Sequence, residues 1–330
     1  MNGDIQITTL LLNVLFLIVG FVFLIKGADV FVDGATSIAK ILKVPALVIG
    51  LTIVALGTSL PELAVSVIAA LEGAGDMSVG NVVGSNIFNI SVVLGATCLL
   101  FPIAIQKEVL SFELPVVLFI SVLLLILGLA FQEVSLIAGI IFLVMLVGYV
   151  FFLIYRSKKQ KENIEVEVEE ESEEPVSPFK SIIFLVLGAA AIWFGGECVN
   201  TTSVVIAKFF GMEENLIALT IVALGTSLPE LVTSLVAAKK GENDVALGNV
   251  IGSNTLNILF ILGVAGVISP VAISEPMIFD MIIMISITAI LFIMAIFTHK
   301  KKGLTLPCGV ILLACYITYL TYIIIRNYAG

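Results

Sequence analysis

Charged residues are scarce in this chain. Asp, Glu, Lys and Arg make up 12% of its 330 residues, whereas hydrophobic residues make up 60% and the mean hydropathy is +1.19. A soluble domain carries about 25% charged residues. The composition therefore excludes a soluble globular protein and predicts a multi-pass protein of the cell membrane. The first residues, Met1 to Ile5, include no basic side chain, so we expect no cleaved signal peptide.

Metal-ligating side chains are also rare. The one histidine, His299, adjoins a basic run at the end of an apolar stretch, and the four cysteines lack the spacing of a metal site. We interpret the cysteines as small buried apolar residues; they are Cys98, Cys198, Cys308 and Cys315. The sequence predicts no enzyme active site, no cofactor, no nucleic-acid partner and no obligate protein partner.

Acidic residues are concentrated in one segment. Eight glutamates lie between Glu162 and Glu174, within a chain whose net charge is −9. This is the only long polar stretch, and it divides the chain near its middle. We expect residues 156–178 to form a solvated cytoplasmic tether. A low-affinity sensor of divalent cations is the alternative interpretation.

Ten apolar stretches are long enough to cross a bilayer core of about 30 Å, which needs about 20 residues of helix. Five precede the acidic segment and five follow it, which predicts an all-α membrane protein with one five-helix unit at 1–155 and another at 179–330. The stretches are 8–32, 46–70, 79–101, 110–131, 134–155, 179–200, 217–238, 246–269, 277–298 and 304–325.

The two units are copies of one another, related by an offset of 168 residues. The sequence TIVALGTSLPEL occurs at Thr52–Leu63 and again, unchanged, at Thr220–Leu231. GNVVGSNIFNI at Gly80–Ile90 corresponds to GNVIGSNTLNI at Gly248–Ile258. The duplication predicts two repeats with the same internal structure.

An odd number of spans in each repeat makes the second copy enter the membrane from the opposite side. Basic residues, which favour the cytoplasmic side, test this orientation. If the N-terminus lies outside, 13 of the 16 Lys and Arg residues fall on the cytoplasmic side. We therefore expect inverted repeats, with both termini outside and the acidic linker inside.

Inverted repeats with broken helices are a recurrent transporter plan, and each repeat offers two candidate breaks, in helices 2 and 3 and in helices 7 and 8. In helix 2, Pro61 lacks an N–H and clashes with the preceding turn. We expect Ser59 to cap the restarting helix, with Glu62 closing a capping box. Free carbonyls such as that of Ala55 would then be suitable ligands for a cation. An ordinary cap or proline kink is the alternative.

Glu62 and Glu230 lie near the middle of their predicted spans. A carboxylate at the bilayer centre costs at least about 2.5–3.5 kcal/mol, which makes each a candidate functional residue. Lys26 is a single basic residue in the first predicted span, and it has no counterpart in the second copy. We infer that the missing partner of the two carboxylates is a mobile cation.

Helices 3 and 8 add neutral oxygen atoms. Ser85 and Asn89 share one helix face, and Ser253 and Asn257 repeat the pattern. Close packing of small residues is the alternative explanation. Carboxylates, amides, hydroxyls and carbonyls suit Ca²⁺ or Na⁺ and not zinc or copper. We expect the remaining amides of these motifs to be structural: Asn81, Asn86, Asn249 and Asn254.

The doubled GTSLPE and GNVVGSNIFNI motifs resemble the α-repeats of the cation/calcium antiporter superfamily, the sodium/calcium exchangers, in their prokaryotic form. The α-repeats would be residues 50–95 and 218–263. The resemblance implies a ten-helix fold that exchanges three Na⁺ for one Ca²⁺ by alternating access, with helices 1 and 6 sliding across a stationary core. It implies the ion ligands Glu62, Glu230, Asn89, Asn257, Ser59, Ser227, Thr58, Thr226, Ser85 and Ser253, with backbone oxygens of Ala55 and Ala223.

Asn257 departs from part of this family, because some relatives have Asp at this position and potassium-dependent exchangers use an acid there. The amide argues against K⁺ dependence. Three other functions stay open: a cation/proton exchanger of the same superfamily, a passive cation channel, and an intramembrane hydrolase that uses the glutamates as acid and base. Identical motifs around both carboxylates favour a symmetric ion site over the asymmetric chemistry of a hydrolase.

Overall fold

The computed structural model describes residues 2–164, 177–212, 223–300 and 303–329, and nearly all of them are helical. In this part of the chain, eight helices are long and apolar enough to cross a membrane, and a bent pair supplies a ninth. The sequence predicts ten spans. The start of the predicted span 217–238 and most of the acidic linker lie outside the described residues.

The first half follows the predicted order of helices. Its elements are α1 (Asn2–Leu42), α2 (Ala46–Ile49), η1 (Gly50–Val54), α3 (Ala55–Thr58), α4 (Leu60–Leu71), α5 (Gly75–Phe88), η2 (Asn89–Val93), α6 (Leu94–Leu100), η3 (Val109–Glu113), α7 (Leu114–Phe131), β1 (Glu133–Val134) and α8 (Leu136–Ile164). The η elements are single π-helical turns within longer helices.

The described helices of the second half follow the same order, although its strand comes one span earlier. Its elements are α9 (Pro178–Phe209), α11 (Ala223–Gly225), α12 (Leu228–Lys239), α13 (Asn243–Leu256), η5 (Asn257–Ile261), α14 (Leu262–Ile268), β2 (Val271–Ala272), α15 (Glu275–Thr298) and α16 (Leu306–Ala329). The strands β1 and β2 pair antiparallel, Val134 with Val271, and join the two halves at one end of the bundle.

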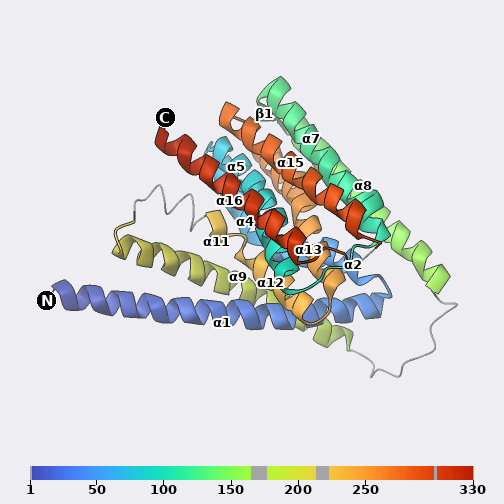
Figure 1. Cartoon of the computed structure of the whole chain (residues 1–330), viewed down its shortest axis with the longest axis horizontal. Coiled ribbons are helices and arrows are strands. Elements are labelled where there is room, and N and C mark those ends of the chain that lie inside the picture. The colour runs from blue at the N-terminus through green and yellow to red at the C-terminus, as the bar shows by residue number, and fades with distance from the viewer. Residues whose placement is uncertain (1, 165–176, 213–222, 301–302, 330) are drawn as a thin grey trace.

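Helices α1 and α9 lie side by side along the lower edge of Figure 1 and run in opposite directions. Glycines allow their backbones to touch. A Cβ atom added at Gly27 would lie 2.8 Å from Cβ of Ala191 and 2.9 Å from the backbone N of Ile192. The remaining helices form a second group, in which α5–α6 and α13–α14 are the most deeply buried.

The predicted break in helix 2 is present. α3 ends at Thr58, α4 begins at Leu60, and the two segments meet at an angle of 52°. Ser59 between them has φ −85° and ψ 9°, and Ser227 has nearly the same values, φ −92° and ψ 6°. The identical sequence therefore forms the same turn in both halves, with proline in the first turn of the restarting helix.

The predicted capping box is wrong. The Ser59 side chain makes no cap hydrogen bond, because its hydroxyl turns toward the other half of the protein. Its N–H donates to the Ala55 carbonyl at 3.0 Å, so this carbonyl is not unpaired and would ligate a cation only through its second lone pair. The chain bends at a single residue and does not unwind.

The predicted breaks in helices 3 and 8 are also wrong. Gly75–Leu100 and Asn243–Ile268 are continuous helices of 26 residues. Each contains one π-helical turn, which begins at Asn89 in the first half and at Asn257 in the second. No proline interrupts either segment, so the hydrogen-bond ladder widens without ending.

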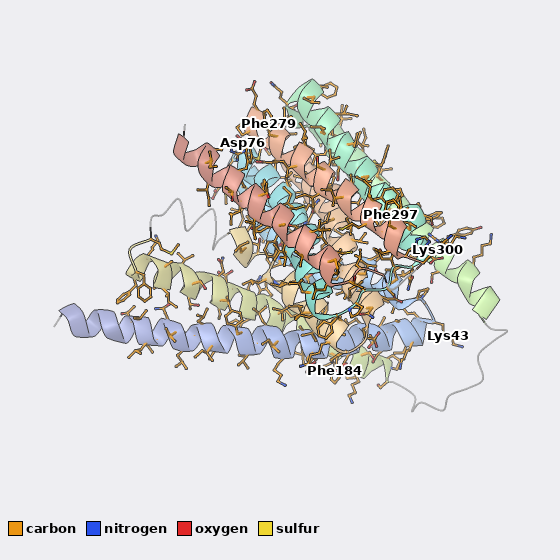
Figure 2. The ribbon with its side chains drawn as sticks, in the orientation of Figure 1. Lys43, Asp76, Phe184, Phe279, Phe297 and Lys300 are labelled. Atoms are coloured by element: carbon orange, nitrogen blue, oxygen red, sulfur yellow. The ribbon has the colours of Figure 1, made fainter. Side chains whose placement is uncertain are left out.

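The outer surface of the bundle is apolar along its length and polar at its ends. Phe279 and Phe297 project outward from α15 with 60% and 71% of their surface exposed (Figure 2). Lys43 and Lys300 lie at one end of the helices and Asp76 at the opposite end. Exposed aromatic and aliphatic side chains between charged ends match a lipid-facing surface.

Candidate cation-binding site

Two fully buried glutamates lie just after the two helix breaks. Glu62 and Glu230 have no exposed surface. Each accepts a hydrogen bond from the serine of the opposite motif: Ser227 Oγ donates to Glu62 Oε1 at 3.1 Å, and Ser59 Oγ donates to Glu230 Oε1 at 3.0 Å. The reciprocal bonds join both motifs in a single site, which is closed to solvent in this conformation.

Two asparagines fix the backbone behind these glutamates. Asn81 Nδ2 donates to the Glu62 carbonyl at 3.1 Å and to Ser66 Oγ at 2.9 Å. Asn249 makes the equivalent bonds, at 3.3 Å to the Glu230 carbonyl and at 2.9 Å to the serine at position 234. Both amides hold helices of the same half together, as a structural role requires.

A second amide pair joins the halves. Asn86 Nδ2 donates to the Asn254 carbonyl at 3.2 Å, and Asn254 Nδ2 donates to the Asn86 carbonyl at 3.4 Å. Asn257 Nδ2 donates to Asn86 Oδ1 at 3.0 Å. The bond leaves Asn257 Oδ1 as the unused acceptor of that side chain.

Several buried oxygen atoms have no hydrogen-bond partner among the described residues. Six of these oxygen atoms belong to predicted ligands: Oε2 of Glu62 and Glu230, Oδ1 of Asn89 and Asn257, Oγ1 of Thr226 and Oγ of Ser253. The Thr226 and Ser253 hydroxyls approach the Glu62 and Glu230 carboxyls, respectively, without completing a hydrogen bond. A buried polar atom left unpaired costs about 1–3 kcal/mol, so this concentration needs a compensating ligand.

The structure places the other predicted ligands around the same centre. Thr58 is fully buried, and Ser85 Oγ accepts a hydrogen bond from Ser227 Oγ at 3.2 Å. Ala55 begins α3 and Ala223 begins α11, one turn before each break. The oxygen-rich donor set, with two carboxylates and no thiolate or imidazole in it, fits a hard cation such as Ca²⁺ or Na⁺.

Two further buried acids were not singled out in the sequence, although each lies within a predicted span. Glu113 accepts a hydrogen bond from Tyr149 at 2.6 Å, and Asp280 accepts one from Arg326 at 3.0 Å. Glu113 therefore has a hydroxyl partner, and Asp280 has a cationic partner. Glu62 and Glu230 differ from both because each keeps one buried oxygen without a partner, and neither forms a salt bridge with a described cationic side chain.

No other metal centre is evident in the described parts of the chain, where no three His, Cys, Asp or Glu residues form a group that could hold an ion. A cation held by Glu62 and Glu230 would therefore take its remaining ligands from neutral oxygen atoms. That combination is available at the meeting point of the two motifs.

Comparison with known proteins gives consistent matches. A family model described as "Sodium/calcium exchanger protein" matches residues 12–155 and 180–325. CaxA of Alkalimonas amylolytica, named as an antiporter, is 41% identical over 313 residues, which cover 94% of this chain and 98% of CaxA. The sodium/calcium exchanger MaX1 of Methanosarcina acetivorans is 35% identical over 345 residues, covering 93% of this chain and 97% of MaX1.

The fold is similar to a solved exchanger. The structure of the sodium-calcium exchanger NCX_Mj, soaked with Na⁺ and Ca²⁺, superposes with a TM-score of 0.80 and 29% sequence identity over 94% of this chain and 98% of that one. These relatives are ion transporters and not enzymes. The chain is a membrane antiporter that belongs to the sodium/calcium exchanger family.

Proposed function

We propose that this protein exchanges Na⁺ for Ca²⁺ across the cell membrane by alternating access. The observation that carries the proposal is the pair of buried carboxylates, Glu62 and Glu230, each with an unpartnered oxygen atom. Two negative charges without a cationic side chain require a cation from outside the protein. MaX1 and NCX_Mj, which are named sodium/calcium exchangers, favour these two ions.

The proposed ligands combine charged and neutral oxygen atoms, and Ca²⁺ takes about 6–8 of them. They are the carboxylates of Glu62 and Glu230, the amides of Asn89 and Asn257, the hydroxyls of Ser59, Ser227, Thr58, Thr226, Ser85 and Ser253, and the carbonyls of Ala55 and Ala223. Two carboxylates neutralise one Ca²⁺. Three Na⁺ ions leave one more positive charge in the site, so transport is electrogenic.

Residues 1–155 and 179–330 form the inverted repeats in this proposal, with residues 156–178 on the cytoplasmic side. Both termini lie at the left of Figure 1, which supports an even number of crossings. Lys43 and Lys300 share the end opposite Asp76 (Figure 2), which supports the charge-based orientation. Single cysteines at 73–75 and at 239–242, in a cysteine-free background, should react with an impermeant maleimide from opposite sides of the membrane.

The same orientation test has a clear negative result. Labelling of both positions from one side would contradict the inverted topology.

In the proposed cycle, α1 and α9 slide together across the remaining helices, because their glycine-lined contact holds them as one unit.

The coupling ion decides between the proposed exchange and its main rival. We expect an outward-directed Na⁺ gradient to drive ⁴⁵Ca²⁺ uptake into proteoliposomes, and an equal pH gradient at constant Na⁺ to leave uptake at background. Uptake driven by the pH gradient alone would make the protein a Ca²⁺/H⁺ exchanger. Flux that needs no counter-ion would make it a channel.

A further inference from the structure

The hydrogen bonds around the site fall into two groups. In the first group, every bond has an equivalent 168 residues away: the Ser–Glu pairs, the Asn81 and Asn249 bonds to the glutamate backbone, and the Asn86–Asn254 bridge. In the second group, a bond is made in one half and its equivalent is absent. The second group involves side chains proposed as ligands.

The clearest member of the second group joins Thr58 to Asn249. Thr58 Oγ1 lies 3.0 Å from Asn249 Oδ1, closer than to the carbonyls of Val54 and Ala55 at 3.3 and 3.2 Å. The equivalent pair would be Thr226 and Asn81. Thr226 Oγ1 has no hydrogen-bond partner among the described residues. Asn249 is fully buried, whereas Asn81 is only partly buried.

This difference affects ion binding because a threonine hydroxyl ligates a cation through its lone pairs. Its proton must then point to an acceptor elsewhere. Asn249 Oδ1 supplies that acceptor for Thr58, and the two Nδ2 bonds of Asn249 hold the amide so that Oδ1 faces Thr58. Thr226 makes no bond to Asn81 in this conformation, and its Oγ1 completes no hydrogen bond among the described residues.

We propose that Asn249 and Asn81 are positioning residues that engage Thr58 and Thr226 alternately, one in each orientation of the transporter. The described conformation has the Thr58–Asn249 bond, and the opposite orientation has Thr226–Asn81 in its place. Each amide orients a ligand hydroxyl of the opposite repeat and favours one orientation. The inference rests on the proposed alternating-access function and adds a switch to it.

The identical motif makes the test direct. Thr52–Leu63 and Thr220–Leu231 have the same sequence, so their intrinsic amide exchange rates are the same and differences report structure. Hydrogen–deuterium exchange by mass spectrometry on the full chain in lipid nanodiscs, in a Na⁺ buffer without Ca²⁺, would compare both segments. The residues flanking each motif differ, Ala64 against Val232, so longer peptides are distinguishable.

Asn249→Ala and Asn81→Ala are matched variants. Both remove the same bonds to a glutamate carbonyl and a serine, but only Asn249→Ala removes a bond to threonine in this conformation. We expect Asn249→Ala to raise exchange several-fold in the first motif and lower it in the second. Asn81→Ala should change the two motifs in the opposite sense. Equal increases in both motifs for both variants would mean a purely structural role and would overturn the proposal.

Isosteric variants guard against misfolding. Thr58→Val should reproduce the exchange pattern of Asn249→Ala, and Thr226→Val that of Asn81→Ala, because each removes the hydroxyl partner with little change of shape. Asn249→Asp keeps an acceptor for Thr58 and should retain the wild-type protection of the first motif. Matching patterns in Thr58→Val and Thr226→Val would contradict the proposal. Amide exchange reports conformation and not ion flux. The test of the switch therefore stays valid even if flux assays identify H⁺ in place of Na⁺ as the coupling ion.

Discussion

The two halves of the molecule make matching serine–glutamate bonds at the centre and carry different charges at the rim. At the centre, Ser59 and Ser227 make the same bond to the glutamate of the other half. The rim is the end of the bundle where α12 stops and meets α1. There, Lys240 pairs with Asp29 and Asp33 of α1, at 3.0 and 2.7 Å. The offset of 168 residues puts Glu72 at the position of Lys240, and Glu197 and Thr201 at the positions of the two aspartates.

This contrast separates two requirements. A single cation site built from two inverted copies needs matching ligands from each copy, so the centre is duplicated. The rim faces different sides of the membrane in the two copies, so its charges can differ. One rim attracts α1 to the core through an ion pair, whereas the equivalent contact at the other rim would bring two carboxylates together.

Removing one central charge should have the largest effect. Glu62→Gln and Glu230→Gln preserve the shape of the side chain and each remove a carboxylate that the bilayer disfavours by at least about 2.5–3.5 kcal/mol. We expect both variants to lose Na⁺-driven ⁴⁵Ca²⁺ flux and to melt at or above the wild-type temperature. Normal flux in either variant would show that the two carboxylates are not equivalent ion ligands.

The glycine contact between α1 and α9 should give the next largest effect, again equal in both halves. Gly27 and Gly195 are equivalent, and a Cβ atom at Gly195 would lie 2.6 Å from the backbone N of Leu24. Alanine at either position should destabilise the fold by about 1–3 kcal/mol through overpacking. Gly148→Ala is the control, since no heavy atom lies within 4 Å of its added Cβ. Thermal melting in detergent measures the difference; equal melting temperatures for all three variants would refute the close contact.

The rim ion pair should have a smaller effect. Partial burial alone lowers the pKa of Lys240, but hydrogen bonds and charge from Asp33 and Asp29 outweigh it, so the pKa lies above its usual range. The stabilisation is therefore fully present below about pH 10.4 and is lost only as pH rises through the folded value. An exposed pair contributes about 0–1 kcal/mol.

We expect Lys240→Gln to raise amide exchange in the Asp29–Leu42 part of α1 by up to about fivefold at neutral pH, which corresponds to about 1 kcal/mol. The neighbouring Lys239→Gln is the matched control and should leave α1 unchanged. Equal exchange of α1 in both variants would show that the ion pair does not hold this helix against the core.

The acidic linker should have the smallest effect. Deleting Glu162–Glu174 removes most of the negative charge between the halves, yet the central contacts do not involve it. We expect exchange activity and its Ca²⁺ dependence to stay within about twofold of wild type, since a solvated tether contributes little to a packed core. A large loss of flux in a deletion variant that still melts cooperatively would favour a sensor or docking role.

Hydropathy predicted the helices well because burial in lipid requires long apolar stretches. The predicted span 110–131 corresponds to Val109–Phe131, and 46–70 corresponds to Ala46–Leu71. The first span was predicted to end at 32, whereas α1 continues to Leu42 and packs Val32, Ala35 and Ile38 into the core. The acids in this last third of α1 pair with Lys240. A partner more than 200 residues away leaves no local signal.

The capping-box prediction at the break in helix 2 also failed because the partner of Ser59 is distant in the sequence. Ser59 and Glu62 have the spacing of a capping box, but Ser59 donates to Glu230, which lies 171 residues away in the sequence. The duplicated motif predicted that two glutamates act together. It did not predict which serine meets which glutamate, nor that the Thr58–Asn249 bond forms in one half only. Three-dimensional pairing between the repeats decides both.

The most direct test of the central claim is the number of Ca²⁺ ions bound at equilibrium. Purified protein in Na⁺-free buffer should bind one ⁴⁵Ca²⁺ per chain, Na⁺ should displace it, and Glu62→Gln and Glu230→Gln should each abolish binding, because both halves complete a single site. Two ions per wild-type chain, with one remaining in each variant, would show two independent sites and contradict this account.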